Sequence, residues 1–370
     1  MVCGYSLRLK HRRKPLNAKR RREVSAGIIL LLLFLGGAAV SRQVRAMDLS
    51  VELSGGYDDN PALTETPTGR FFAHYGVSLN QEILQRSEYV VEGLVTLDYR
   101  DYEADSDYMR LEGGMSLFYA PPGSRFQARF SAGAALYRDH LVEEDERDEA
   151  FASVRLDMVA SPKLTLGMSH TWRWLDYRNP HVPFEARGYS GASSQPGRGG
   201  GILGGSSHVP IPTADLDKGR KNGGPAGRGK HGMTGKGTPD RDDVLVDTAL
   251  HLDVFPAPSV NVGVYAGYAE ANSSLDLETF SRLYAGFFLE WIPADLWRVE
   301  LGGGWKESRY DEAPGDIDRR DVTRLAYVEL GRRFGALGAF SRISWLENDS
   351  LLAVESYTQK VVQCGFSWAF

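Results

Sequence analysis

The chain has 370 residues, of which 42% are hydrophobic and 25% are charged, and its formal net charge is −5. This composition is typical of a water-soluble protein, and after residue 46 no apolar stretch is long enough to cross a bilayer as a helix. The two cysteines, Cys3 and Cys364, exclude a fold held together by several disulfides.

Residues 1–46 have the layout of a secretory signal peptide. A basic stretch comes first, the apolar run 26–40 follows, and Val44, Arg45 and Ala46 then offer a cleavage site. We therefore predict export and cleavage after Ala46, which also removes Cys3. The alternative is a retained membrane anchor, but the apolar run is shorter than the roughly twenty residues that a spanning helix needs.

From residue 47 onward, short segments alternate apolar and polar residues between clusters of turn residues. In one of them Val91, Val95 and Leu97 alternate with Glu92 and Asp98. A period of two predicts strands with one apolar and one polar face. We count about fourteen such segments, an even number as in single-chain bacterial barrels. The predicted fold is all-β: a transmembrane antiparallel up-and-down β-barrel over residues 47–370.

The predicted connections differ in length in a regular way. Those after even-numbered strands are short, whereas those after odd-numbered strands are long and mostly acidic, the first opening at residues 55–61. A barrel with both termini in the periplasm has short periplasmic turns and long external loops. This pattern predicts the outer membrane of a Gram-negative bacterium as the location, with membrane lipid and lipopolysaccharide as surroundings.

The last segment carries large aromatic residues on its apolar face, Phe366, Trp368 and Phe370, and Cys364 lies on the same face. It resembles the C-terminal signal strand of bacterial outer-membrane β-barrels, whose terminal Phe is read by the barrel insertion machinery. The resemblance implies that Phe366, Trp368 and Phe370 form an insertion signal. We expect Cys364 to act as a small apolar residue facing lipid.

The opposite face of the predicted strands is polar and carries charges of both signs. We predict that these charges line the lumen, because a dry interior would not hold so many ions unpaired. The predicted lumen-lining charges are Glu92, Asp98, Glu112, Arg129, Arg155, Asp157, Asp247, Asp253, Arg282, Glu290, Arg298, Glu300, Glu329, Arg333 and Arg342. Two interpretations remain open, a weakly selective aqueous pore and a salt-bridged lumen that loops block.

Residues 184–242 differ from the rest of the chain because they are rich in Gly, Ser, Lys and Arg and show no periodicity. We predict a flexible external loop between the seventh and eighth strands. It could gate the mouth through its opposite charge, capture anionic polysaccharide, or be a tolerated insertion. The basic run resembles an RNA-binding tail, but an exported chain has no nucleic-acid partner.

The sequence offers little support for catalysis. Ser169 and His170 are adjacent, and adjacent residues of a strand point to opposite faces, so they cannot form a nucleophile–base pair. His170 falls on the outward face, predicted near the rim, where an enzyme acting on acyl chains would need it. The scattered His74, His140 and His251 lack metal-ligand spacing. We expect no metal, no cofactor and no enzymatic activity.

The opening of the first predicted hairpin, residues 55–61 with the sequence GGYDDNP, resembles that of a group of porin-like or export-type proteobacterial outer-membrane β-barrels. The group includes barrels from exopolysaccharide loci and the barrel half of surface-lipoprotein assembly modifiers, although no helical repeat region precedes the barrel here. The resemblance implies a passive pore or an export conduit for small polar solutes or polysaccharide, with polysaccharide or other envelope export partners. The alternatives are a structural or secretion-accessory barrel with an occluded lumen and, third, an outer-membrane lipid-modifying enzyme.

Overall fold

In the computed structural model, residues 47–63, 67–102, 106–141, 145–178, 241–274, 278–294, 296–311, 319–351 and 356–370 are described. The predicted signal peptide, residues 1–46, lies outside these ranges. So does the predicted loop 184–242, apart from residues 241 and 242, which begin a strand. Within the described ranges, no helix has the length and hydrophobicity to span a membrane.

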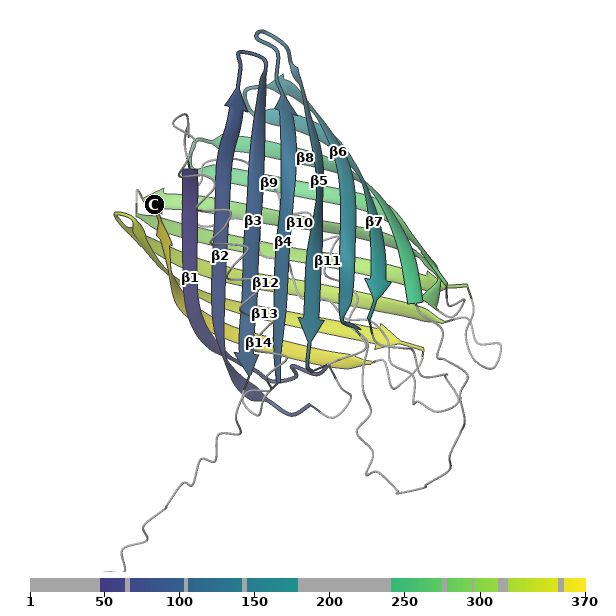
Figure 1. Ribbon diagram of the computed structural model, residues 1–370. Coiled ribbons are helices and arrows are strands. Elements are labelled where there is room, and N and C mark those ends of the chain that lie inside the picture. Colours follow the sequence, from purple (N-terminus) through teal and green to yellow (C-terminus); the bar gives the residue numbers. More distant parts are fainter. Residues whose placement is uncertain are drawn as a thin grey trace, which may run out of the picture. The chain divides into compact units, whose positions relative to one another are not determined.

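The described residues form fourteen antiparallel strands that close into a barrel, which confirms the predicted fold (Figure 1). The strands are β1 (Met47–Asp58), β2 (Arg70–Gln85), β3 (Tyr89–Tyr102), β4 (Ser106–Tyr119), β5 (Phe126–Asp139), β6 (Arg147–Ser161), β7 (Leu164–Tyr177), β8 (Arg241–Ala257), β9 (Val260–Ser273), β10 (Phe280–Ala294), β11 (Trp297–Tyr310), β12 (Arg320–Phe334), β13 (Leu337–Ser350) and β14 (Tyr357–Ala369).

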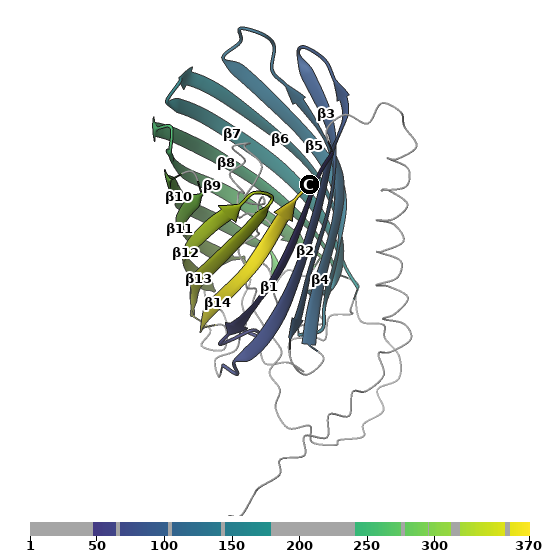
Figure 2. The same cartoon turned by 90° about the vertical axis from the view of Figure 1, so that its left-hand side faces the viewer.

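Each strand pairs with its neighbours in the sequence, and the last strand pairs with the first. The closing register places Val51 opposite Trp368 and Leu53 opposite Phe366, and the amide of Phe370 donates to the carbonyl oxygen of Leu49 at 2.9 Å. Figure 2 shows β14 running beside β1. Closure leaves no free sheet edge, so each strand has a hydrogen-bonding partner on both sides.

The connections at one end of the barrel, here called the turn end, are residues 86–88, 120–125, 162–163, 258–259, 295–296 and 335–336. Those at the other end, the loop end, are 59–69, 103–105, 140–146, 178–240, 274–279, 311–319 and 351–356. The expected sorting by length therefore holds with two departures. Residues 103–105 are a short connection at the loop end, and 120–125 are longer than the other turns.

Strand β1 continues further than the sequence predicts. The predicted loop at 55–61 starts only after Asp58, because residues 55–58 remain paired with both neighbouring strands. A Cβ atom at Gly56 would lie 2.7 Å from the Phe72 ring, so this glycine lets the ring lie against the strand. Asp58 is fully buried and accepts hydrogen bonds from Gln359 and Tyr102. These contacts keep a glycine-rich segment extended.

The outer face of the barrel is apolar. Exposed side chains on this face include Leu53, Phe71, Phe130, Leu156, Met168, Leu250, Leu283, Leu301, Val328, Ile343 and Phe366. Trp291 and Trp297 lie beside the turn end, whereas Trp174 and Trp305 lie nearer the loop end. Large exposed hydrophobic surfaces are rare on water-soluble monomers, and aromatic residues at both borders are typical of barrels in a bilayer.

The inner face is polar, and contacts that pass over an intervening strand identify it. Arg110 on β4 reaches Glu149 on β6, and Tyr284 on β10 donates to Asp247 on β8 at 2.7 Å. Side chains from strands that are not neighbours can converge in this way on the concave side of a curved sheet. The apolar and polar residues that alternate in the sequence therefore lie on the outer and the inner face of the barrel wall, respectively.

If hydrocarbon surrounds the outer face, Ile343→Arg will destabilise the folded barrel by about 2–4 kcal/mol, because Ile343 is exposed near the middle of β13. Urea unfolding of the refolded protein in lipid vesicles measures this. The matched control is Ser344→Arg on the inner face of the same strand, for which we expect a much smaller loss. Equal effects of the two substitutions would contradict the assignment of the faces.

Candidate functional site

The inner wall is the candidate functional site, and it carries the charged residues that the sequence singles out. Glu92 and Asp98 lie on β3, Glu112 on β4, Arg129 on β5, Arg155 and Asp157 on β6, Asp247 and Asp253 on β8, Arg282 and Glu290 on β10, Arg298 and Glu300 on β11, Glu329 and Arg333 on β12, and Arg342 on β13. Most of them take part in one of several polar groups described next.

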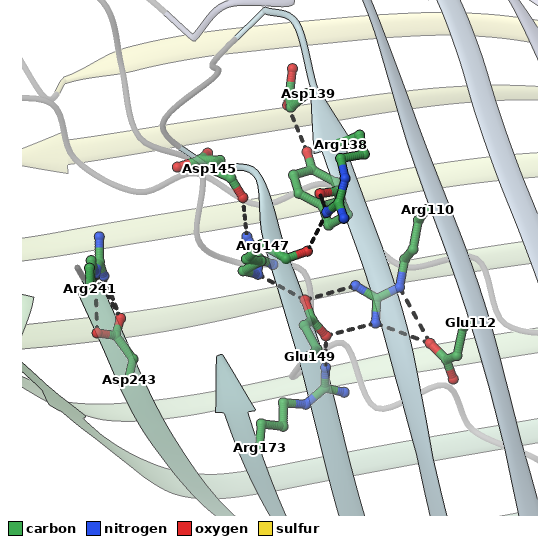
Figure 3. Close-up of polar contacts among 11 residues, drawn as sticks. Arg110, Glu112, Arg138, Asp139, Asp145, Arg147, Glu149, Arg173, Arg241 and Asp243 are labelled. Atoms are coloured by element: carbon green, nitrogen blue, oxygen red, sulfur yellow. Dashed lines mark hydrogen bonds and ion pairs between the residues drawn. The ribbon is translucent and has the colours of Figure 1, made fainter. Parts of the chain in front are cut away.

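The densest group is centred on Glu149, whose side chain is fully buried (Figure 3). Arg110 forms a bidentate pair with this carboxylate at 3.1 and 3.2 Å, Arg147 approaches it at 2.8 Å, and Arg173 at 3.4 Å. Arg110 also contacts Glu112 at 3.0 Å. We call these five residues the Glu149 cluster. Because an unpaired buried charge is costly, the carboxylate and the guanidinium groups depend on one another.

Four residues of this cluster are absent from the predicted set of charged residues: Glu149, Arg110, Arg147 and Arg173. Glu149 belongs to the acidic run 143–149, and this composition predicts a solvent-exposed loop. In the structure β6 begins at Arg147, so Glu149 already points to the inner face. The signal that could have revealed it is the spacing of two between Arg147 and Glu149, which places both on one face of a strand.

Aromatic side chains accompany the arginines near the loop end. The guanidinium carbon of Arg147 lies 4.8 Å from the ring centroid of Tyr137, and that of Arg241 lies 4.2 Å from Tyr177. The guanidinium carbon of Arg100 lies 4.5 Å from the Phe72 centroid. Cation–π contacts add to ion pairing in holding these side chains, so the inner wall is tightly packed here.

A second group brings together five of the predicted residues from β10 to β13. Arg298 donates to Glu290 at 2.7 Å and also binds Glu300, while Arg342 pairs with Glu329 at 2.8 Å. Arg298 and Glu329 lie 3.8 Å apart and link the two pairs. The predicted charges on this wall therefore largely neutralise one another.

Of the two predicted arginines on β5 and β6, one is paired with carboxylates of the described residues and the other is not. Arg155 donates to both carboxylate oxygens of Asp157 at 2.9 and 3.0 Å, and it lies 3.7 Å from Asp253. Arg129 lies directly opposite Arg155 in the strand register, and among the described residues its side chain makes no hydrogen bond or ion pair. Its guanidinium carbon lies 5.5 Å from the Phe118 ring centroid.

A further group joins the first strands to the last and includes the predicted Asp98. His74, which is 2% exposed, contacts Asp98 at 2.7 Å and Glu52 at 3.1 Å through its two ring nitrogens. Gln363 on β14 donates to Ser54 on β1 at 2.6 Å, and Ser54 lies 3.1 Å from His74. This network crosses the seam where the barrel closes. His74 is one of the scattered histidines of the sequence, but its two carboxylate partners lie on other strands and no local pattern reveals them.

The other histidines confirm one expectation and correct another. Ser169 contacts His251 at 3.0 Å on the inner face, whereas His170 contacts Thr248 at 2.7 Å on the outer face, so Ser169 and His170 do point apart. His170 lies in the middle of β7 rather than near the rim, because the strand extends to Tyr177. The described residues contain no group of three or more His, Cys, Asp and Glu that could hold a metal ion.

The residues of the predicted insertion signal lie on β14 and, in the case of Phe370, directly after it. Phe366 is 50% exposed and Phe370 is 72% exposed on the outer face, and the rings of Phe366 and Trp368 lie 6.3 Å apart. Cys364 is exposed on the same face and is a free cysteine, 3.3 Å from the hydroxyl of Ser341.

No protein-family model matches the chain, and no curated protein matches it. Among solved structures it is similar to a loop-deletion mutant of OmpT, an outer membrane protein of Vibrio cholerae, with 8% identity, coverage of 88% of this chain and 99% of that chain, and a TM-score of 0.46. An anion-selective porin from Comamonas acidovorans has 9% identity, coverage of 88% and 99%, and a TM-score of 0.42. The CymD monoaromatic hydrocarbon channel has 9% identity, coverage of 91% and 92%, and a TM-score of 0.45.

These three proteins are an outer membrane protein, a porin and a channel, and the selectivity or cargo named for each of them concerns that protein alone. The architecture of the present chain, a closed antiparallel barrel of fourteen strands with an apolar outer face, is that of barrels of the outer-membrane type.

Replacing the central carboxylate of the Glu149 cluster tests how far its arginines depend on it. Glu149→Gln will lower the free energy of unfolding by about 3–5 kcal/mol, because it leaves buried guanidinium groups without their shared counter-charge. Glu112→Gln is the control, since Glu112 is partly exposed and, among the described residues, forms its ion pair with Arg110. We expect it to cost less than about 1 kcal/mol. Equal shifts in urea midpoint would show that Glu149 is not the centre of the cluster.

Proposed function

We propose that this chain is an integral outer-membrane β-barrel of a Gram-negative bacterium that acts as a passive pore or export conduit for small polar solutes or polysaccharide. The observation that carries the proposal is the opposite chemistry of the two faces of a closed wall. Hydrophobic side chains cover the outside, and ion pairs and hydroxyl groups line the inside. Such a wall suits hydrocarbon on one side and water on the other.

The number of strands supports a lumen wide enough for solutes. Barrels of about eight strands are filled by their own side chains, whereas those of about sixteen to eighteen leave an aqueous channel. A barrel of fourteen strands is closer to the second class. The half-buried state of Glu92, Arg129, Ser153 and Arg155 is consistent with contact with solvent in the lumen.

A structural or secretion-accessory barrel with an occluded lumen is the second candidate, and the packing at the loop end favours it. Asp58 and Asp139 are fully buried there, and Phe72, Tyr102, Tyr108 and Tyr137 form a buried aromatic cluster on the inner face. Packing of this kind on the inner face is what a barrel with an occluded lumen requires.

Single-channel recording separates the two candidates. For a pore, the refolded mature chain will give stable current steps in a planar lipid bilayer. We expect a reversal potential near zero in a salt gradient, because most of the charges along the wall are paired with charges of opposite sign. An electrically silent barrel that is folded and inserted would favour the occluded candidate. Strong preference for anions or cations would contradict the balanced wall.

We further propose that Phe366, Trp368 and Phe370 are recognised by the barrel insertion machinery. Phe370 is the most exposed of the large hydrophobic side chains on the described strands and their ends, so its ring contributes little to the packing of the folded barrel. Its backbone contacts with Leu49 do not involve the ring.

Phe370→Ala will therefore reduce the amount of folded barrel in the outer membrane of expressing cells several-fold, while leaving the stability of protein refolded in vitro within about 1 kcal/mol. Immunoblotting of membrane fractions and urea unfolding measure the two quantities. The matched control is Phe71→Ala, an exposed outer-face aromatic at the loop end. Similar losses in cells for both variants would argue against a special role of the C-terminus.

A further inference from the structure

One part of the inner wall combines hydroxyl groups and aromatic rings. Ser116 on β4, Ser131 on β5, Ser153 on β6 and Thr171 on β7 are directly opposite one another in the strand register. We call these four residues the hydroxyl row. They occupy one level of four neighbouring strands, so their side chains follow one another around the wall at the interstrand spacing of about 4.8 Å.

Most hydroxyl groups of the row are available to form hydrogen bonds with a ligand. Ser116 donates to Glu92 at 3.3 Å, but within the described residues the side chains of Ser131, Ser153 and Thr171 make no hydrogen bond. All four residues are half-buried, so the lumen can reach them. A hydroxyl both donates and accepts, and three free ones in succession suit a ligand that also does both.

Aromatic rings lie on either side of the row along the strands. Phe151 lies on the loop-end side, and its ring rests on two glycines, since a Cβ atom would lie 2.6 Å from Phe151 Cζ at Gly133 and 3.5 Å from it at Gly114. Phe118 lies on the turn-end side. Both rings are half-buried. The glycines thus allow an aromatic ring to lie along the wall next to the hydroxyl groups.

The surrounding charges decide which ligand fits. Arg155 is paired with Asp157 and also lies near Asp253, and Arg129 supplies one further positive charge. Two carboxylates lie opposite the ends of the row in the strand register, Glu92 opposite Ser116 and Asp247 opposite Thr171. On the loop-end side of Phe151, the Glu149 cluster adds three arginines and two carboxylates, and its Arg173 lies 6.0 Å from the Phe151 ring centroid. Positive and negative groups therefore nearly balance around the row, and this does not favour a ligand with a net charge.

We infer that the hydroxyl row, with Phe151 and Phe118, forms a binding surface for a neutral sugar in the lumen. Sugars present alternating hydroxyl groups and an apolar ring face, and these match free hydroxyls at regular spacing beside an aromatic ring. The inference rests on the proposed function in that it assigns a substrate class, neutral carbohydrate, to the same lumen.

The test uses the refolded mature chain in detergent micelles and equilibrium dialysis with radiolabelled glucose, with glucosamine and glucuronate as positively and negatively charged competitors. The triple variant Ser131→Ala, Ser153→Ala and Thr171→Val will weaken glucose binding about tenfold or more, because each lost hydrogen bond is worth roughly a factor of two to ten. Phe151→Leu will weaken it as well. Ser344→Ala, on the inner face of β13, is the control and will leave binding unchanged.

Unaltered glucose binding by the triple variant, or no glucose binding by the unmodified chain, would overturn the inference. So would much stronger competition by glucuronate or glucosamine than by unlabelled glucose. If the triple variant does not fold, as judged by heat-dependent mobility in gel electrophoresis, the Phe151→Leu result decides. Binding does not require an open channel. A conducting barrel without glucose binding contradicts this inference alone, and a silent barrel that binds glucose contradicts the pore alone.

Discussion

Closure of the sheet is the constraint on which the rest of the structure depends. In a hydrocarbon environment, an unpaired backbone group has no water to bind, so a spanning sheet must have no edge. Here β1 and β14 meet in register from Ser50 to Asp58, and Phe370 continues the pairing with Leu49. Once the ring is closed, each strand has one face outside and one inside. Alternate residues of the sequence therefore face different surroundings, hydrocarbon on the outside and water on the inside.

Closure also explains why the inner wall is organised as it is. A curved sheet brings side chains of its concave face together, so residues on β4, β6 and β7 can share one carboxylate at Glu149. The same geometry lets Gln359 on β14 and Tyr102 on β3 both reach Asp58 on β1. Two of these contacts, Arg110 with Glu149 and Tyr102 with Asp58, tie strands that do not share backbone hydrogen bonds, and the contact of Gln359 with Asp58 crosses the seam between the first strand and the last. The network is therefore part of what keeps the ring closed.

Alternation made the strands, their number and the two faces predictable, because it depends on neighbours in the sequence alone. Val91, Glu92, Val95 and Asp98 show it plainly, and their faces follow directly. The side chains that these charged residues contact on other strands could not be predicted in this way. The contact of Arg110 with Glu149, or of His74 with Asp98, depends on strand order and register, which no local pattern encodes. Strand ends were missed where tertiary contacts extended the pairing, as at Gly56 and Asp58.

The pairing of charges has a consequence for the lumen as a whole. A lone charge on the wall would act on a solute across the channel, whereas a pair such as Arg298 and Glu290 at 2.7 Å presents a dipole whose field falls off faster with distance. At a salt concentration of about 0.1 M in the lumen, the remaining electric field would be screened beyond about 10 Å. In the proposed pore, a passing solute would then be selected mainly by size and by direct contact with the wall. Direct contact is what half-buried hydroxyls such as Ser131 and Ser153 offer, so a wall that carries many charges can still favour neutral polar solutes.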